Sequence, residues 1–195
     1  MLIKNDFEVA QPVDKVWKFF GDIPQVATCL PGAELTEDLG GEKYQGQVAV
    51  RMGPVRLQFA GTAEIAERDD AAKRLVLNAA GAEAKGRGQA SMVVTAILVR
   101  SGRGTKVNVT QDLQLSGAAA QYGRGMISDV TSVLMRDFAA TMQDRIERVE
   151  RGESAEQIAA SGTSSASGLA LGLRAAVMAL NRVFRRFFVP YHAAS

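Results

Sequence analysis

The stretch KYQGQVAVRMGPVRLQFAGTAEI, residues 43–65, gives the clearest indication of the fold because apolar and polar side chains alternate along it. The pair Gly53-Pro54 divides it into two runs, and each run keeps one apolar and one polar face. Strict alternation is typical of antiparallel strands that have the core on one face and water on the other. The stretch therefore predicts a hairpin in an antiparallel sheet.

The segments on both sides extend this pattern. Further strands are predicted at residues 3–9, 73–78, 89–99 and 106–115, with charged or glycine-rich turns between them. Two short helices are predicted between the first strand and the hairpin, over residues 13–20 and 24–28. From about Ala119 to Val149 the apolar residues recur with the period of a helix. This order predicts an α+β fold in which a curved sheet grips one long C-terminal helix.

The net charge of +2 is unevenly distributed along the 195 residues. Residues 157–195 contain four arginines and no acidic residue, whereas the remainder holds 19 basic and 21 acidic residues. A nucleic-acid-binding domain would carry its positive charge on the folded part, so no nucleic-acid partner is expected. We predict a domain over residues 1–150, a flexible Ser-, Ala- and Gly-rich linker over 151–168, and a detached amphipathic helix with the terminus over 169–195.

The tail places its arginines opposite leucines and phenylalanines on a helical wheel. This pattern is typical of a helix that lies on a membrane surface, and docking on the domain or on a partner protein is the alternative. No signal sequence or spanning segment is expected, so we predict a cytoplasmic protein, peripheral on the inner face of the cell membrane. The expected membrane contacts are Arg174, Arg182, Phe184, Arg185, Arg186, Phe187 and Phe188.

The residues that usually carry catalysis are scarce. His192 is the only histidine, and Cys29 is the only cysteine. A histidine triad and a histidine-rich metal site are therefore excluded, and we predict no catalytic residue, no metal and no enzymatic activity. Cys29 is expected to be structural or to line a cavity. Glu83, Lys85 and Arg87 are expected to be solvated in a hairpin.

Many inward positions of the predicted strands carry small or flexible residues, which predicts an open apolar cavity; ordinary close packing is the alternative. The apolar residues expected to line the cavity are Trp17, Phe20, Leu30, Phe59, Met92, Val130, Leu134 and Phe138. Gln111 and Tyr44 are polar exceptions on these faces. Gln111 could donate a hydrogen bond to a ligand carbonyl or mark a bulge that turns it outward, and Tyr44 raises the same question.

Four short motifs resemble the CoxG family of carbon monoxide dehydrogenase: CLPGAE at 29–34, MGPV at 52–55, FAG at 59–61 and LSG at 115–117. The resemblance covers residues 1 to about 150. It implies the START-like, or SRPBCC, helix-grip fold, with a seven-stranded antiparallel sheet around the C-terminal helix and a hydrophobic ligand cavity. It also implies a molybdenum carbon monoxide dehydrogenase, or a related xanthine-oxidase-type enzyme, as the partner.

Cavity, linker and tail together predict a membrane-associated carrier for a lipid-soluble molecule. A carbon monoxide dehydrogenase must pass electrons to the respiratory chain, so a quinone such as menaquinone is the expected cargo. A bound quinone or lipid is accordingly the expected cofactor, with none that is covalent or metallic. The alternative is a ligand-free adaptor that recruits the dehydrogenase to the membrane or helps it mature.

Overall fold

The structure, a computed structural model, describes residues 1–153. The elements are, in chain order, β1 (Leu2–Val9), α1 (Val13–Phe20), α2 (Ile23–Cys29), β2 (Ala33–Gly40), β3 (Lys43–Met52), β4 (Val55–Asp69), β5 (Arg74–Glu83), β6 (Gln89–Ser101), β7 (Gly104–Leu115), the 3-10 turn η1 (Gly117–Gln121) and α3 (Arg124–Glu150).

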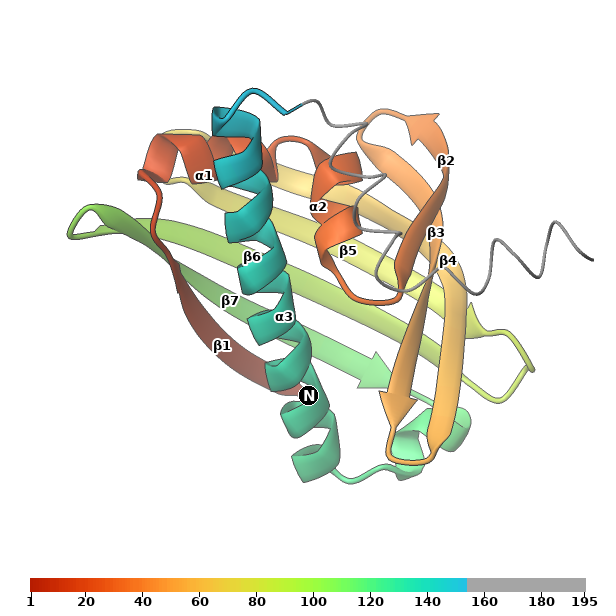
Figure 1. Cartoon of the computed structure of the whole chain (residues 1–195). Coiled ribbons are helices and arrows are strands. Elements are labelled where there is room, and N and C mark those ends of the chain that lie inside the picture. The colour runs from red at the N-terminus through yellow and green to blue at the C-terminus, as the bar shows by residue number, and fades with distance from the viewer. Residues whose placement is uncertain (154–195) are drawn as a thin grey trace, which may run out of the picture. The chain divides into compact units, whose positions relative to one another are not determined.

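The seven strands form one antiparallel sheet in the order β1-β7-β6-β5-β4-β3-β2. The sheet curves, and α3 crosses its concave face (Figure 1). The predicted helix-grip fold is therefore confirmed. The alternation of residues 43–65 appears as the β3–β4 hairpin, in which Met52 pairs with Val55 across the Gly53-Pro54 turn.

A row of glycines crosses the middle strands. Gly46, Gly61 and Gly81 are register partners on β3, β4 and β5. A Cβ added to Gly61 would lie 2.0 Å from the carbonyl oxygen of Ala80, so only a hydrogen atom fits there. Glycines within strands permit such close approach and mark tight bends, so this row favours the curvature of the sheet.

The short helices begin and end at local signals. Pro12 precedes α1, whose Val16, Phe19 and Phe20 are buried. The Asp22 carboxylate caps α2, accepting a hydrogen bond from the backbone N–H of Gln25 at 3.1 Å. These contacts fix α2 beside β2, and both elements contribute residues to the cavity described below.

Two separate clusters of buried side chains stabilise the fold. The larger one joins β1, α1 and the C-terminal half of α3, and Phe138 makes edge-to-face contacts there with Phe7 and Phe20 at 5.9 and 6.3 Å between ring centroids. The smaller one surrounds the start of α3 and contains Ile3, Met52, Leu57, Ala119 and Ile127. Burial of these apolar side chains supplies the main favourable term in folding.

Residues 154–195 lie outside the described part of the chain, so most of the predicted linker and all of the predicted tail helix stay predictions. The expected membrane contacts lie in this segment: Arg174, Arg182, Phe184, Arg185, Arg186, Phe187 and Phe188. Within residues 1–153, no helix has the length and apolar character needed to cross a membrane.

Candidate ligand-binding site

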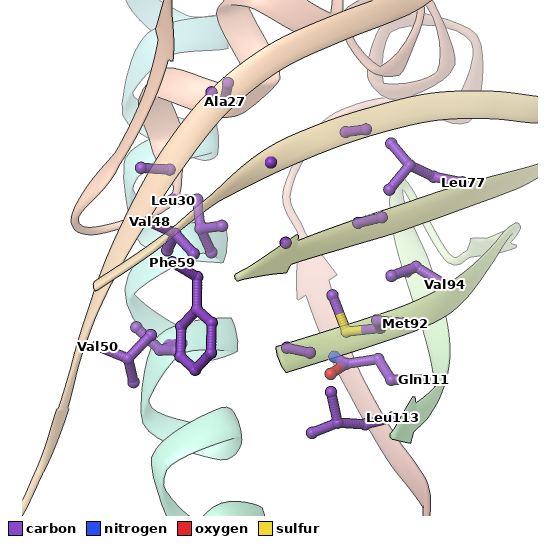
Figure 2. Close-up of a pocket in the computed structure, with 18 of the residues that line it drawn as sticks. Ala27, Leu30, Val48, Val50, Phe59, Leu77, Met92, Val94, Gln111 and Leu113 are labelled. Carbon is purple, nitrogen blue, oxygen red and sulfur yellow. The ribbon is translucent and has the colours of Figure 1, made fainter. Parts of the chain in front are cut away.

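A cavity of about 450 Å³ lies between the two buried clusters and is partly open to the outside. Its walls come from α2, α3 and the inward faces of strands β2 to β7. Small-molecule sites usually enclose about 300–1,000 Å³, so this volume can hold a ligand. Figure 2 shows Val50 and Phe59 on one side of the space and Met92, Gln111 and Leu113 on the other.

The cavity exists because the sheet presents small residues where it faces the helix. Ala63 and Ala79 pair across β4 and β5, next to the paired Gly61 and Gly81. Side chains this short cannot reach α3, whose Val130 and Leu134 line the opposite wall. The small residues that predicted a cavity in the sequence therefore do line one.

Eight of the ten residues expected to line the cavity do so: Phe20, Leu30, Phe59, Met92, Gln111, Val130, Leu134 and Phe138. They come from α1, the end of α2, β4, β6, β7 and α3, so the fold gathers them from almost the whole domain. That they contact a ligand stays a prediction.

Trp17 and Tyr44 lie elsewhere. The indole Nε1 of Trp17 donates a hydrogen bond to Asp70 at 2.7 Å, and the ammonium of Lys73 lies 5.7 Å from the ring centroid. Trp17 thus ties α1 to the β4–β5 turn, because it lies on the flank of α1 rather than on the face that carries Val16 and Phe20.

Tyr44 is half-buried against the larger cluster, near the β2–β3 turn and outside the cavity. Burial, and then the negative charges of Asp38 and Glu42, raise the pKa of its phenol above the ordinary 10.0. The phenol therefore stays protonated at neutral pH. The sequence placed Tyr44 on the correct face of β3 but could not show how far along the strand the cavity extends.

The sequence missed the wall that α2 and β2 provide. Ile23, Val26 and Ala27 of α2 and Leu35 of β2 line the cavity. Helix α2 is only seven residues long, too short to show a clear apolar stripe. Strand β2 was not predicted from its residues because most of them are exposed and its pairing with β3 is interrupted by register shifts. Val48 and Val50 were detectable, since they lie on the predicted apolar face of β3.

Almost all of the cavity surface is carbon, and most of its polar lining residues have partners. The Thr131 hydroxyl donates to the carbonyl of Ile127 at 2.8 Å. Gln47 donates to Glu34 at 2.8 Å and accepts from Gln58 at 2.6 Å. Gln111 differs, because it is 5% exposed and its amide makes no hydrogen bond to any residue that the structure describes.

The register of β7 resolves the alternatives for Gln111. It pairs with Ile3 of β1 and Val94 of β6 without any bulge, so its side chain faces inward. Figure 2 shows its amide group directed into the cavity beside Met92 and Leu113. The cavity can therefore receive an apolar molecule that carries a hydrogen-bonding group.

Cys29 is buried and does not line the cavity. Burial raises the pKa of its thiol to about 11, against the weaker opposing effect of the Arg145 charge, and its sulfur lies 3.6 Å from the carbonyl oxygen of Gln25. A thiol that is protonated at neutral pH is a poor nucleophile. Within residues 1–153, no three acidic, cysteine or histidine side chains are grouped so that they could hold a metal ion.

The expectation that Glu83 is solvated was wrong. Its side chain is buried, and its carboxylate accepts hydrogen bonds from the Arg87 guanidinium at 2.8 Å and from the backbone N–H of Lys85 at 2.9 Å. The hydrogen bonds from Arg87, opposed by desolvation, hold the pKa of Glu83 at about 2. The turn folds back over the end of β5, and the Arg87 carbonyl accepts from the N–H of Ala118 at 2.7 Å. This network fixes the β5–β6 turn beside η1, whose Ala119 lines the cavity.

A curved seven-stranded antiparallel sheet around a long C-terminal helix, with an apolar cavity between them, defines a START-like protein. Three solved structures show the same fold. A conserved protein from Geobacillus kaustophilus matches with a TM-score of 0.68 and 21% identity, over 76% of this chain and 96% of its own. The ZhuI aromatase/cyclase from Streptomyces sp. R1128 matches with a TM-score of 0.56 and 16% identity, over 80% and 97%. The major latex-like protein 151 from Panax ginseng matches with a TM-score of 0.50 and 14% identity, over 72% and 95%.

The family follows from the sequence match. The sequence model of CoxG, the G subunit of carbon monoxide dehydrogenase, matches residues 6–147, and the chain belongs to this family. A search of the curated proteins finds no match. The structural relatives are too distant in sequence to show more than the fold.

Proposed function

We propose that this protein is a non-catalytic carrier, which binds a lipid-soluble molecule in its cavity and presents it to a molybdenum carbon monoxide dehydrogenase at the membrane. The observation that carries the proposal is a cavity of about 450 Å³ that is lined almost wholly by carbon and contains one unpartnered amide. Removing such a ligand from water is favourable by about 25 cal/mol for each Å² of apolar surface buried.

A respiratory quinone, menaquinone in particular, is the cargo that we propose. A dehydrogenase of this class releases electrons that must reach the respiratory chain, and the family name supports it as the partner. Menaquinone is uncharged, and its ring and isoprenoid tail are apolar except for two carbonyl oxygens. These properties match the apolar walls.

The membrane part of the proposal depends on the tail. Arg174, Arg182, Arg185 and Arg186 lie opposite Phe184, Phe187 and Phe188 on a helical wheel, a distribution typical of interfacial helices. We propose that this segment holds the protein on the cytoplasmic face of the cell membrane, where the cargo is dissolved. The linker then lets the domain reach both the lipid and the enzyme.

The test is ligand extraction followed by titration of the emptied protein. Mass spectrometry of a solvent extract from purified protein should detect an isoprenoid quinone, and the emptied protein should take up a short-tailed menaquinone in a saturable manner. Ala79→Phe, which fills the cavity from the sheet, should abolish uptake. Ala82→Phe places the same ring at an exposed position of β5 and is the matched control. Failure of the wild-type protein to take up any quinone would contradict the proposal.

A ligand-free adaptor is the second candidate. The outward face of β6 exposes Val93, Ile97 and Val99, which favours contact with another protein. Deleting residues 169–195 should release the dehydrogenase into the soluble fraction under either proposal. The Ala79→Phe variant separates them, because a carrier loses electron delivery to the quinone pool, whereas an adaptor retains both recruitment and delivery.

A further inference from the structure

Gln111 lies in surroundings that do not satisfy its amide. Its register partners are Ile3 and Val94, and its neighbours on the same face of β7 are Val109 and Leu113. All four side chains are apolar. A buried amide without a partner costs free energy, because it loses its hydrogen bonds to water and gains none in return.

The position of the amide indicates where a partner would lie. Gln111 faces the interior from the sheet, and Figure 2 shows its nitrogen and oxygen at the end of the side chain that enters the cavity. Thr131, another polar lining residue, directs its hydroxyl to the helix backbone and offers no donor of its own to the cavity. A polar group of a bound molecule would therefore find its hydrogen-bonding partner at Gln111.

The charges around the cavity limit the class of ligand further. Glu34 is the only ionisable side chain among the described lining residues; it is exposed and accepts a hydrogen bond from Gln47. An anionic head group, such as a fatty-acid carboxylate or a phosphate, would meet no cation among these residues and would remain buried without a counter-charge. The cavity therefore favours neutral molecules.

We infer that Gln111 is the hydrogen-bonding anchor of the cavity, and that it selects neutral apolar ligands bearing a carbonyl or hydroxyl oxygen and holds that oxygen against β7. A carboxamide has two N–H donors and a carbonyl acceptor, so it can donate to a carbonyl or accept from a hydroxyl. The same residue can therefore bind the oxidised and the reduced form of a ligand whose carbonyl becomes a hydroxyl on reduction. The inference rests on the proposed function, that the cavity receives a lipid-soluble molecule.

The test uses three bicyclic compounds of similar shape: 2-methyl-1,4-naphthoquinone, 2-methyl-1-naphthol and 2-methylnaphthalene. Their dissociation constants are measured by calorimetry or equilibrium dialysis with full-length protein freed of lipid. The variant is Gln111→Met, which keeps the length of the side chain and removes its hydrogen bonds. The matched control is Gln114→Met, the same change on the exposed face of the same strand.

We expect Gln111→Met to weaken binding of the quinone and of the naphthol by about five- to tenfold, as the loss of one hydrogen bond predicts. Binding of 2-methylnaphthalene should stay unchanged or tighten, because the cavity becomes more apolar. Gln114→Met should change none of the three. Comparing variant with wild type for each compound cancels their different solubilities in water.

Two results would overturn the inference in distinguishable ways. If all three compounds bind the wild-type protein and Gln111→Met changes them equally or not at all, Gln111 is no anchor, whereas the carrier function stands. If none of the three binds the wild-type protein, the proposed function fails and the inference fails with it. Thermal unfolding provides a second measurement, since Gln111→Met should raise the Tm of the empty protein by removing an unpartnered amide; a lowered Tm would show that the amide already has a partner.

Discussion

The two halves of α3 run along the same sheet and contact it differently. In the C-terminal half, Met142 and Ile146 are 0% and 6% exposed and belong to the larger buried cluster. In the N-terminal half, Val130 and Leu134 are half-buried and line the cavity. Both halves carry the same apolar stripe in the sequence. The difference comes from the sheet and α1, which fill the space beside Met142 with large side chains, whereas glycines and alanines leave it empty beside Leu134.

The greatest change in stability is expected from truncations in the two halves. Met142→Ala should lower the free energy of unfolding by about 3 kcal/mol, because it opens a void in a closely packed region. Leu134→Ala should cost only about 1 kcal/mol, since this side chain already lacks neighbours on the cavity side. Urea denaturation measures both. Equal costs would indicate that the cavity closes in solution and would remove the distinction between the halves.

A smaller effect is expected from additions to the sheet beneath the cavity. Gly61→Ala should destabilise the protein by about 2 kcal/mol, because the new methyl group would lie 2.0 Å from the carbonyl oxygen of Ala80. Ala63→Val adds more volume on the same strand face but toward the open space, so it should cost less than about 1 kcal/mol and weaken ligand binding. Thermal unfolding and quinone titration check the pair. If Ala63→Val proved the more damaging change, the space above Ala63 would be filled.

The weakest effect concerns the turn that closes the cavity end of the sheet. Folding lowers the pKa of Glu83 from 4.5 to about 2, so its ionised form stabilises the native state above pH 4.5. That contribution is lost as the pH falls from about 4.5 through about 2. Glu83→Gln should therefore lower the Tm at pH 7, and the difference from wild type should shrink over this pH range.

Glu64→Gln provides the control for this pH series. Glu64 is exposed on β4, and its carboxylate lies 3.5 Å from the ammonium of Lys43. Exposed ion pairs contribute little to stability, so this variant should follow the wild-type protein at every pH. A constant Tm difference for Glu83→Gln from pH 7 to pH 2 would show that the Glu83–Arg87 network does not depend on the carboxylate charge.

Much of the fold and part of the site were predictable because periodicity reports which face of an element is buried. It placed Phe59, Met92 and Leu134 on the correct faces, and these residues do line the cavity. Periodicity does not report position along an element, so Trp17 and Tyr44 were expected in the cavity and lie outside it. It also fails for short or exposed elements, which is why the wall formed by α2 and β2 was missed.

Residue types and their local spacing were enough to establish the antiparallel sheet, the long helix, the scarcity of catalytic residues and the small side chains that leave room between sheet and helix. A single chain displays these properties directly. The packed domain was needed to show that Glu83 is buried and paired, that Cys29 is a protonated core thiol, and that Gln111 faces the cavity without a partner. Burial and hydrogen bonding depend on residues far apart in the chain, so Gln111 acquires its apolar surroundings only when β1, β6 and α3 have packed around it.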